Sequence, residues 1–123
     1  MKKLHITSTS ETPEIDFNTN GILLVKGVSI PENVALFYTP VLNWINELAH
    51  NLPTTIQLTF EIEYINTLST RTCLEVIKKI NAYKQQCPNT TITWKYDIDD
   101  DDNFDLGKNL AHIAKAEIEF ETI

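Results

Sequence analysis

Three hydroxyl side chains are crowded into the segment Asn66-Thr67-Leu68-Ser69-Thr70-Arg71. A strand-like run precedes the segment and a helix-like run follows it, so Asn, Ser and Thr side chains here could cap the first free N–H groups of a helix. Capping is one interpretation. The other is that a hydroxyl accepts a phosphoryl group, because a helix N-terminus and the Arg71 guanidinium would both stabilise the added negative charge.

A run of acidic residues begins at Asp97 and could be taken for a calcium loop. Asp97, Asp99 and Asp101 occupy the first three ligand positions of such a loop. The position that requires glycine holds Asp102, however, and the position of the closing bidentate acid holds Lys108. We therefore expect an acidic helix start, which the helix macrodipole favours, and no metal site.

Motifs for cofactors and for catalysis are missing from the rest of the chain. The histidines are scattered and form no zinc-binding spacing, and the glycines are too far apart for a phosphate-binding loop. A nucleophile elbow is also missing. Because these motifs are missing, the sequence favours a binding or regulatory protein over an enzyme and predicts no cofactor. The histidines and glycines concerned are His5, His50, His112, Gly21, Gly27 and Gly107.

The chain has two cysteines, Cys73 and Cys87, in a segment that is expected to be helical. Fourteen helical positions correspond to roughly 20 Å, which is too far for a disulfide. No Cys-x-x-Cys spacing activates either thiol, so both are predicted to be reduced and to lie on the buried stripe of the helix.

Length and charge narrow the class of protein further. The 123 residues, 42% hydrophobic and 22% charged, suit one globular domain spanning 1–123. A net charge of −7 argues against binding to nucleic acid or to an anionic membrane. The N-terminus has no apolar core of a signal peptide or membrane span, so we place the protein in the cytoplasm.

The elements that would position the hydroxyl cluster alternate between strands and helices. A β-hairpin is predicted at 15–25, with its turn at 18–21. A helix should start near Ser29-Ile30-Pro31 and bend at Pro40, and its buried stripe should include Phe37. Further predicted elements are a strand at 55–65 with Tyr64 on its buried face, a helix stripe from Cys73 to Cys87, a strand at 90–96, a helix through Leu106, Leu110 and Ile113, and a strand at 116–123.

This order predicts an α/β domain. Strands separated by helices need crossover connections, which favour a mixed, largely parallel sheet of about five strands covered by helices.

Four segments, in this order, resemble the SiaC family of bacterial regulatory phosphoproteins, whose fold is like that of the STAS anti-sigma factor antagonists. The resemblance spans most of the chain. The chain has Leu68 where the family often has Ser, and Ile30 where a Tyr often precedes Pro-Glu-Asn. The four segments are Ser10–Ile15, Pro31-Glu32-Asn33, Tyr64-Ile65-Asn66-Thr67 with Ser69, and Trp94-Lys95-Tyr96-Asp97.

The resemblance implies that Thr67 is phosphorylated by a dedicated protein kinase and dephosphorylated by a SpoIIE-like metal-dependent phosphatase. In the namesake system the unphosphorylated protein binds and activates a diguanylate cyclase, which controls cyclic di-GMP and biofilm formation. Asn66, Ser69, Thr70 and Arg71 would flank the site, with Ser69 and Thr70 as rival acceptors. The alternative is a STAS-like module that binds a small ligand or an unrelated effector, with Thr67 merely capping the helix.

Overall fold

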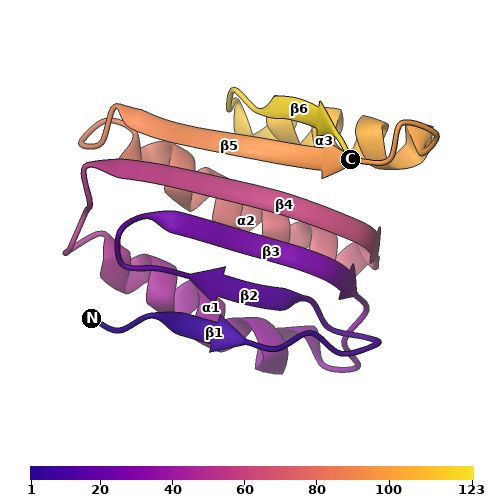
Figure 1. The fold of residues 1–123 in the computed structure, drawn as a ribbon, viewed down its shortest axis with the longest axis horizontal. Helices are drawn as coiled ribbons and strands as arrows, with labels where there is room; N and C mark the ends of the chain where they lie inside the picture. Colours follow the sequence, from indigo (N-terminus) through magenta and orange to yellow (C-terminus); the bar gives the residue numbers. More distant parts are fainter.

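The computed structural model describes all residues from Met1 to Ile123 and contains six strands and three helices (Figure 1). In chain order the elements are β1 (Leu4–Ile6), β2 (Glu14–Phe17), β3 (Ile22–Ser29), α1 (Val34–Leu48), β4 (Thr55–Ile65), α2 (Thr67–Tyr83), β5 (Asn89–Tyr96), α3 (Asp101–Ala114) and β6 (Glu119–Thr122).

One sheet contains all six strands in their sequence order, β1-β2-β3-β4-β5-β6. The pairs β1–β2 and β2–β3 are antiparallel, and the other three pairs are parallel. The predicted mixed, largely parallel α/β fold with its opening hairpin is confirmed. The strand count was one short, because β1 has only three residues and its burial does not alternate strongly enough to stand out in a sequence.

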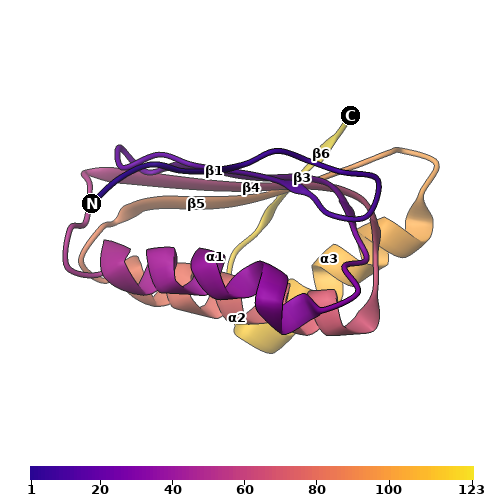
Figure 2. The same ribbon diagram turned by 90° about the horizontal axis from the view of Figure 1, so that it is seen from below.

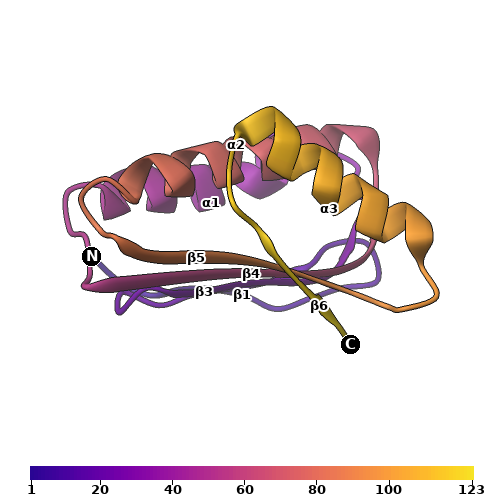
Figure 3. The same cartoon turned by 90° about the horizontal axis from the view of Figure 1, so that it is seen from above.

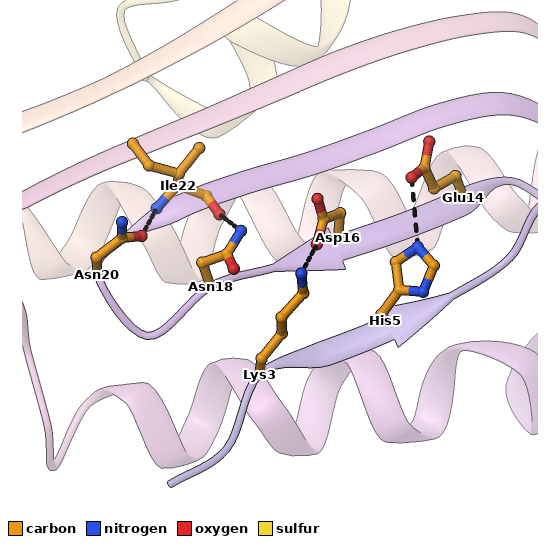
Figure 4. A network of polar contacts seen from close by, with 7 residues as sticks. All are labelled: Lys3, His5, Glu14, Asp16, Asn18, Asn20 and Ile22. Carbon is orange, nitrogen blue, oxygen red and sulfur yellow. Dashed lines mark hydrogen bonds and ion pairs between the residues drawn. The ribbon is translucent and has the colours of Figure 1, made fainter.

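The three helices cover one face of the sheet and leave the other face to solvent (Figures 2 and 3). The core lies between the helices and the inward residues of the strands. The open face is polar along β1 and β2, where Lys3 contacts Asp16 and His5 contacts Glu14, each at 3.4 Å (Figure 4). Trp44 of α1, on the covered side, donates a hydrogen bond to the Lys2 carbonyl at 2.7 Å and so ties the N-terminal segment to α1.

Helix α1 begins later than the sequence predicted. Its N-cap is Asn33, whose side chain accepts the Leu36 N–H at 3.0 Å. Ser29 instead ends β3 and is fully buried. The helix continues as one element through Pro40, as expected. Its buried stripe uses Tyr38 in place of Phe37, which is only half-buried.

Strand β4 shows why one predicted core residue is exposed. The alternation holds as far as Ile62, but Tyr64 is 65% exposed. Gly27 pairs with Ile62, and the next pair joins Val28 to Tyr64, so Glu63 is an extra residue in the ladder. Such a bulge reverses which face the following side chains occupy, and this places Tyr64 outside the core.

The C-terminal elements differ from the prediction in their bounds. Helix α2 ends at Tyr83, so Cys87 lies in the following turn, although it is buried as expected. Helix α3 already begins at Asp101, capped by Asp100, and Ile113 on it is 55% exposed. The last strand is limited to Glu119–Thr122.

Candidate functional site

The start of α2 is fixed by Asn66, which is the N-cap of this helix. Its side-chain oxygen accepts the Ser69 N–H at 2.8 Å, and its carbonyl accepts the Thr70 N–H at 3.0 Å. The Asn66 N–H donates to the Ser29 carbonyl at the end of β3, also at 3.0 Å. The cap therefore positions Thr67 as the first residue of the helix.

The three hydroxyls of this turn have different surroundings. Thr67 is exposed, and its side chain takes no part in the hydrogen bonds that cap the helix. Ser69 is fully buried. Thr70 is half-buried, and its hydroxyl donates to the Asn66 carbonyl at 3.0 Å. Of the three candidate phosphoacceptors, Thr67, Ser69 and Thr70, only Thr67 presents a free hydroxyl to solvent.

Arg71 lies one turn further along α2 and is exposed. It forms none of the ion pairs of the structure, so its guanidinium is available to an anion near the helix start. The first N–H groups of a helix also carry partial positive charge. The Arg71 guanidinium and these N–H groups would both stabilise the negative charge of a phosphate on Thr67.

A buried polar cluster lies beneath this turn and was missed by the sequence analysis. The Ser29 hydroxyl and the Tyr38 hydroxyl are hydrogen-bonded at 2.6 Å. Burial raises the pKa of Tyr38, as does the nearby Cys73, while the hydroxyls of Ser29 and Ser69 partly oppose the rise. The Ser-Pro pattern at 29–31 suggested a helix start and concealed the role of Ser29 in this cluster.

An apolar surface borders Thr67 where α1 and α2 run side by side. Two large side chains stand exposed on it, Leu36 at 75% and Leu68 at 56%. Leu68 lines two open hollows, one of them about 360 Å³ in volume. The residues of this surface are Val34, Ala35, Leu36, Phe37, Leu42 and Leu68, with Arg71 and Glu75 at its edge.

A separate hollow, of about 590 Å³, lies at the ends of β4 and β5 and is acidic. Asp97 and Asp100 line it, and their carboxylates accept backbone N–H groups of Asp99 and Asn103. Nowhere in the chain do three His, Cys, Asp or Glu side chains gather in a way that could hold a metal ion. The hydrogen bonds accepted by Asp97 and Asp100 order the loop and cap α3.

Both cysteines are free and buried. Burial raises the pKa of the Cys73 thiol to about 12, so this thiol stays protonated at neutral pH. Cys87 donates to the Pro53 carbonyl at 3.4 Å. Both thiols are buried, whereas reactive thiolates lie in partly exposed surroundings.

Taken together, the features are those of an α/β regulatory domain with an exposed hydroxyl beside an apolar surface. A family comparison makes the class definite. The chain belongs to the SiaC family of regulatory phosphoproteins, whose model matches residues 6–123.

The chain is also similar to individual proteins and solved structures. The chain is 26% identical over 98 residues to an uncharacterized protein of Pseudomonas aeruginosa strain UCBPP-PA14, covering 79% of this chain and 78% of the relative. The crystal structure of apo-SiaC from P. aeruginosa superposes with a TM-score of 0.85 at 22% identity and covers 99% of this chain and 98% of the other.

A second solved structure contains a partner. A chain in the crystal structure of the diguanylate cyclase SiaD in complex with its activator SiaC, also from P. aeruginosa, matches with a TM-score of 0.87 at 21% identity, covering 98% of this chain and 99% of that one. These structures show that the chain has the SiaC fold. None of its helices is both long and apolar enough to cross a membrane.

Proposed function

We propose that this protein is a non-enzymatic regulator switched by reversible phosphorylation of Thr67, and that its unphosphorylated form binds and activates an effector. The observation that carries the proposal is the position of Thr67. It is the exposed hydroxyl at the start of α2, next to the unbonded Arg71 and to the exposed Leu68. One residue thus borders both an anion-stabilising helix end and an apolar surface.

Charge is the physical basis of the switch. A phosphate adds about −1.5 to −2 charges at neutral pH. The apolar surface beside Thr67 suits a closely packed interface, and a misplaced charge in such an interface costs several kcal/mol. A loss of about 3 kcal/mol already lowers affinity roughly a hundredfold. Phosphorylation would therefore release the effector while leaving the fold in place.

The partners that we propose follow the SiaC family. A protein kinase would phosphorylate Thr67 and a SpoIIE-like metal-dependent phosphatase would remove the phosphate. For the effector we propose a diguanylate cyclase, because SiaC of P. aeruginosa is the activator of the cyclase SiaD. The output would then be the cellular level of cyclic di-GMP and, through it, biofilm formation.

The experiment is a co-purification from the protein's own cells. Tagged wild-type protein and the variants Thr67→Ala and Thr70→Ala are purified, and the fractions are assayed for conversion of GTP to cyclic di-GMP. We expect cyclase activity with the wild type, more with Thr67→Ala, and a wild-type level with the control Thr70→Ala. Fractions without cyclase activity would contradict the proposed effector. Equal activity with all three proteins would contradict the role of Thr67.

A further inference from the structure

A buried polar cluster joins the start of α2 to α1 and β3. Its members are Ser29 and Ser69, both fully buried, Tyr38 at 2% exposure and Cys73 at 1%. All four side chains are buried, and of these only Tyr38 reaches the hollow beside Leu68, which it helps to line. The proposed function gives them no role, and yet they lie directly beneath the turn that carries Thr67.

Ser29 is the link between the three elements. Its hydroxyl is hydrogen-bonded to the Tyr38 hydroxyl at 2.6 Å, and its carbonyl accepts the Asn66 N–H at 3.0 Å. Asn66 in turn accepts the Ser69 N–H at 2.8 Å. A continuous chain of hydrogen bonds therefore runs from α1, through the end of β3, to the first turn of α2.

The Ser69 hydroxyl is the unsatisfied member of the cluster. Its oxygen is fully buried and has no hydrogen-bond partner. Native proteins keep few such groups, because a buried hydroxyl without a partner is costly. The Ser69 hydroxyl lowers the pKa of Tyr38 by a hydrogen-bonding effect, so the phenol lies close to Ser69, although the two hydroxyls do not form a full hydrogen bond. A small displacement of the turn would let Tyr38 bond to Ser69 instead of Ser29.

We propose that Tyr38 is a positioning residue of the Thr67 switch, and that its hydroxyl exchanges Ser29 for Ser69 when Thr67 is phosphorylated. The phosphate attracts the first N–H groups of α2 and competes with the Asn66 cap for them. The turn is displaced, the Ser69 hydroxyl gains a partner, and α1 follows Tyr38. This inference rests on the proposed function, since it takes Thr67 as the phosphoacceptor.

Movement of α1 matters because α1 supplies five of the six apolar residues of this surface. Ala35, Leu36 and Phe37 precede Tyr38 in the same turn of the helix and line the hollow that Leu68 borders. Phosphorylation would then reshape this surface as well as add charge at its edge. An element with two alternative hydrogen-bonding arrangements, such as Tyr38, can convert a local change of charge into a movement of a whole helix.

The test places the phosphate without a kinase. Phosphothreonine is incorporated at position 67 by genetic encoding in the full chain, and amide hydrogen exchange is compared with that of the unphosphorylated protein. The matched control is Tyr83→Phe. The Tyr83 hydroxyl also bonds across to α1, to the Ile45 carbonyl at 2.8 Å, but it lies about 24 Å further along α2.

We expect the phosphate to change amide exchange at 35–39 severalfold in the wild type and in Tyr83→Phe, and to leave it unchanged in Tyr38→Phe. No change in the wild type, or the same change in Tyr38→Phe, would overturn the inference. If Tyr38→Phe does not fold, Ser29→Ala removes the same hydrogen bond with the ring in place and must give the same loss. Because the phosphate is installed directly, the result is separate from whether cells phosphorylate Thr67.

Discussion

The side-chain oxygen of Asn66 accepts the Ser69 N–H at 2.8 Å, and so the residue before Thr67 fixes the turn on which Thr67 stands. The same Asn66 is tied through its own N–H to Ser29 in the sheet. Capping and switching are therefore carried by neighbouring residues. Asn66 holds the helix end, and the exposed Thr67 is left free to be modified.

Replacing Asn66 by Ala should lower the free energy of unfolding by about 0.5–2 kcal/mol, the usual cost of losing an N-cap. Asp100→Ala, which removes the cap of α3, is the control and should cost a similar amount. Urea unfolding gives both values. Amide exchange should rise at the start of α2 only in Asn66→Ala, and a uniform rise across both helices would contradict the local role of the cap.

Replacing Ser69 by Ala should raise the free energy of unfolding by about 1 kcal/mol. The change removes a buried hydroxyl without a partner and improves helix propensity. Ser29→Ala is the contrast, because the Ser29 hydroxyl is bonded to Tyr38 and its loss should destabilise by about 1–3 kcal/mol. Thermal or urea unfolding compares the two, and destabilisation by Ser69→Ala would show that its hydroxyl does have a partner.

Stability should fall as the pH rises above 9. The unfolded Cys73 thiol ionises near its ordinary pKa of 9.0, whereas burial raises the pKa in the folded protein to about 12. Between these values the folded state binds the extra proton, so the free energy of unfolding falls by up to ~1.4 kcal/mol per pH unit. Burial also raises the pKa of Tyr38 and of Tyr83, which adds a fall of the same sign above pH 10.

Urea unfolding of the wild type and of Cys73→Ala between pH 8 and pH 11 checks this prediction. The variant lacks the thiol, so its stability should fall less steeply above pH 9. Parallel curves for the two proteins would show that the Cys73 thiol does not contribute to the pH dependence.

The sequence predicted the fold wherever a pattern was long and local. Strand β4 alternates cleanly from Ile56 to Ile62, and the Asn66 cap stands directly before the stripe of α2. Tyr64 was placed on the wrong face because the bulge opposite Gly27 and Val28 depends on pairing with β3. The sequence of β4 alone does not show how this strand pairs with β3.

The candidate site, too, could be predicted only where its residues are close together in the sequence. The crowded hydroxyls, Asn66 and Arg71 are consecutive in sequence and were therefore found. The cluster of Ser29, Tyr38 and Ser69 was missed because its members come from three elements and meet only in the folded chain. Exposure also had to come from the structure, since Thr67 and Ser69 differ by one helical half-turn and have opposite environments.

Substitutions at Thr67 should separate binding from folding. Thr67→Ala should bind the effector constitutively, and Thr67→Glu should mimic the phosphorylated state only in part, since it carries one charge and fewer acceptor oxygens. Both variants should melt close to the wild type, because the Thr67 side chain is exposed and takes no part in capping the helix, and because the helix end and Arg71 accommodate the charge of Thr67→Glu locally. Calorimetric titration with the purified effector gives the affinities, and equal affinities for both variants would contradict a charge-based switch.

Mapping of phosphorylation on protein purified from its own cells tests the central claim most directly. Intact mass and fragmentation of the peptide spanning 66–78 would be measured for the wild type and for Thr67→Ala. The account predicts one phosphoryl group in a fraction of the wild-type protein, located on Thr67, and none in Thr67→Ala. Equal phosphorylation of Thr67→Ala, or a phosphate found only on Thr70 or Thr72, would contradict it.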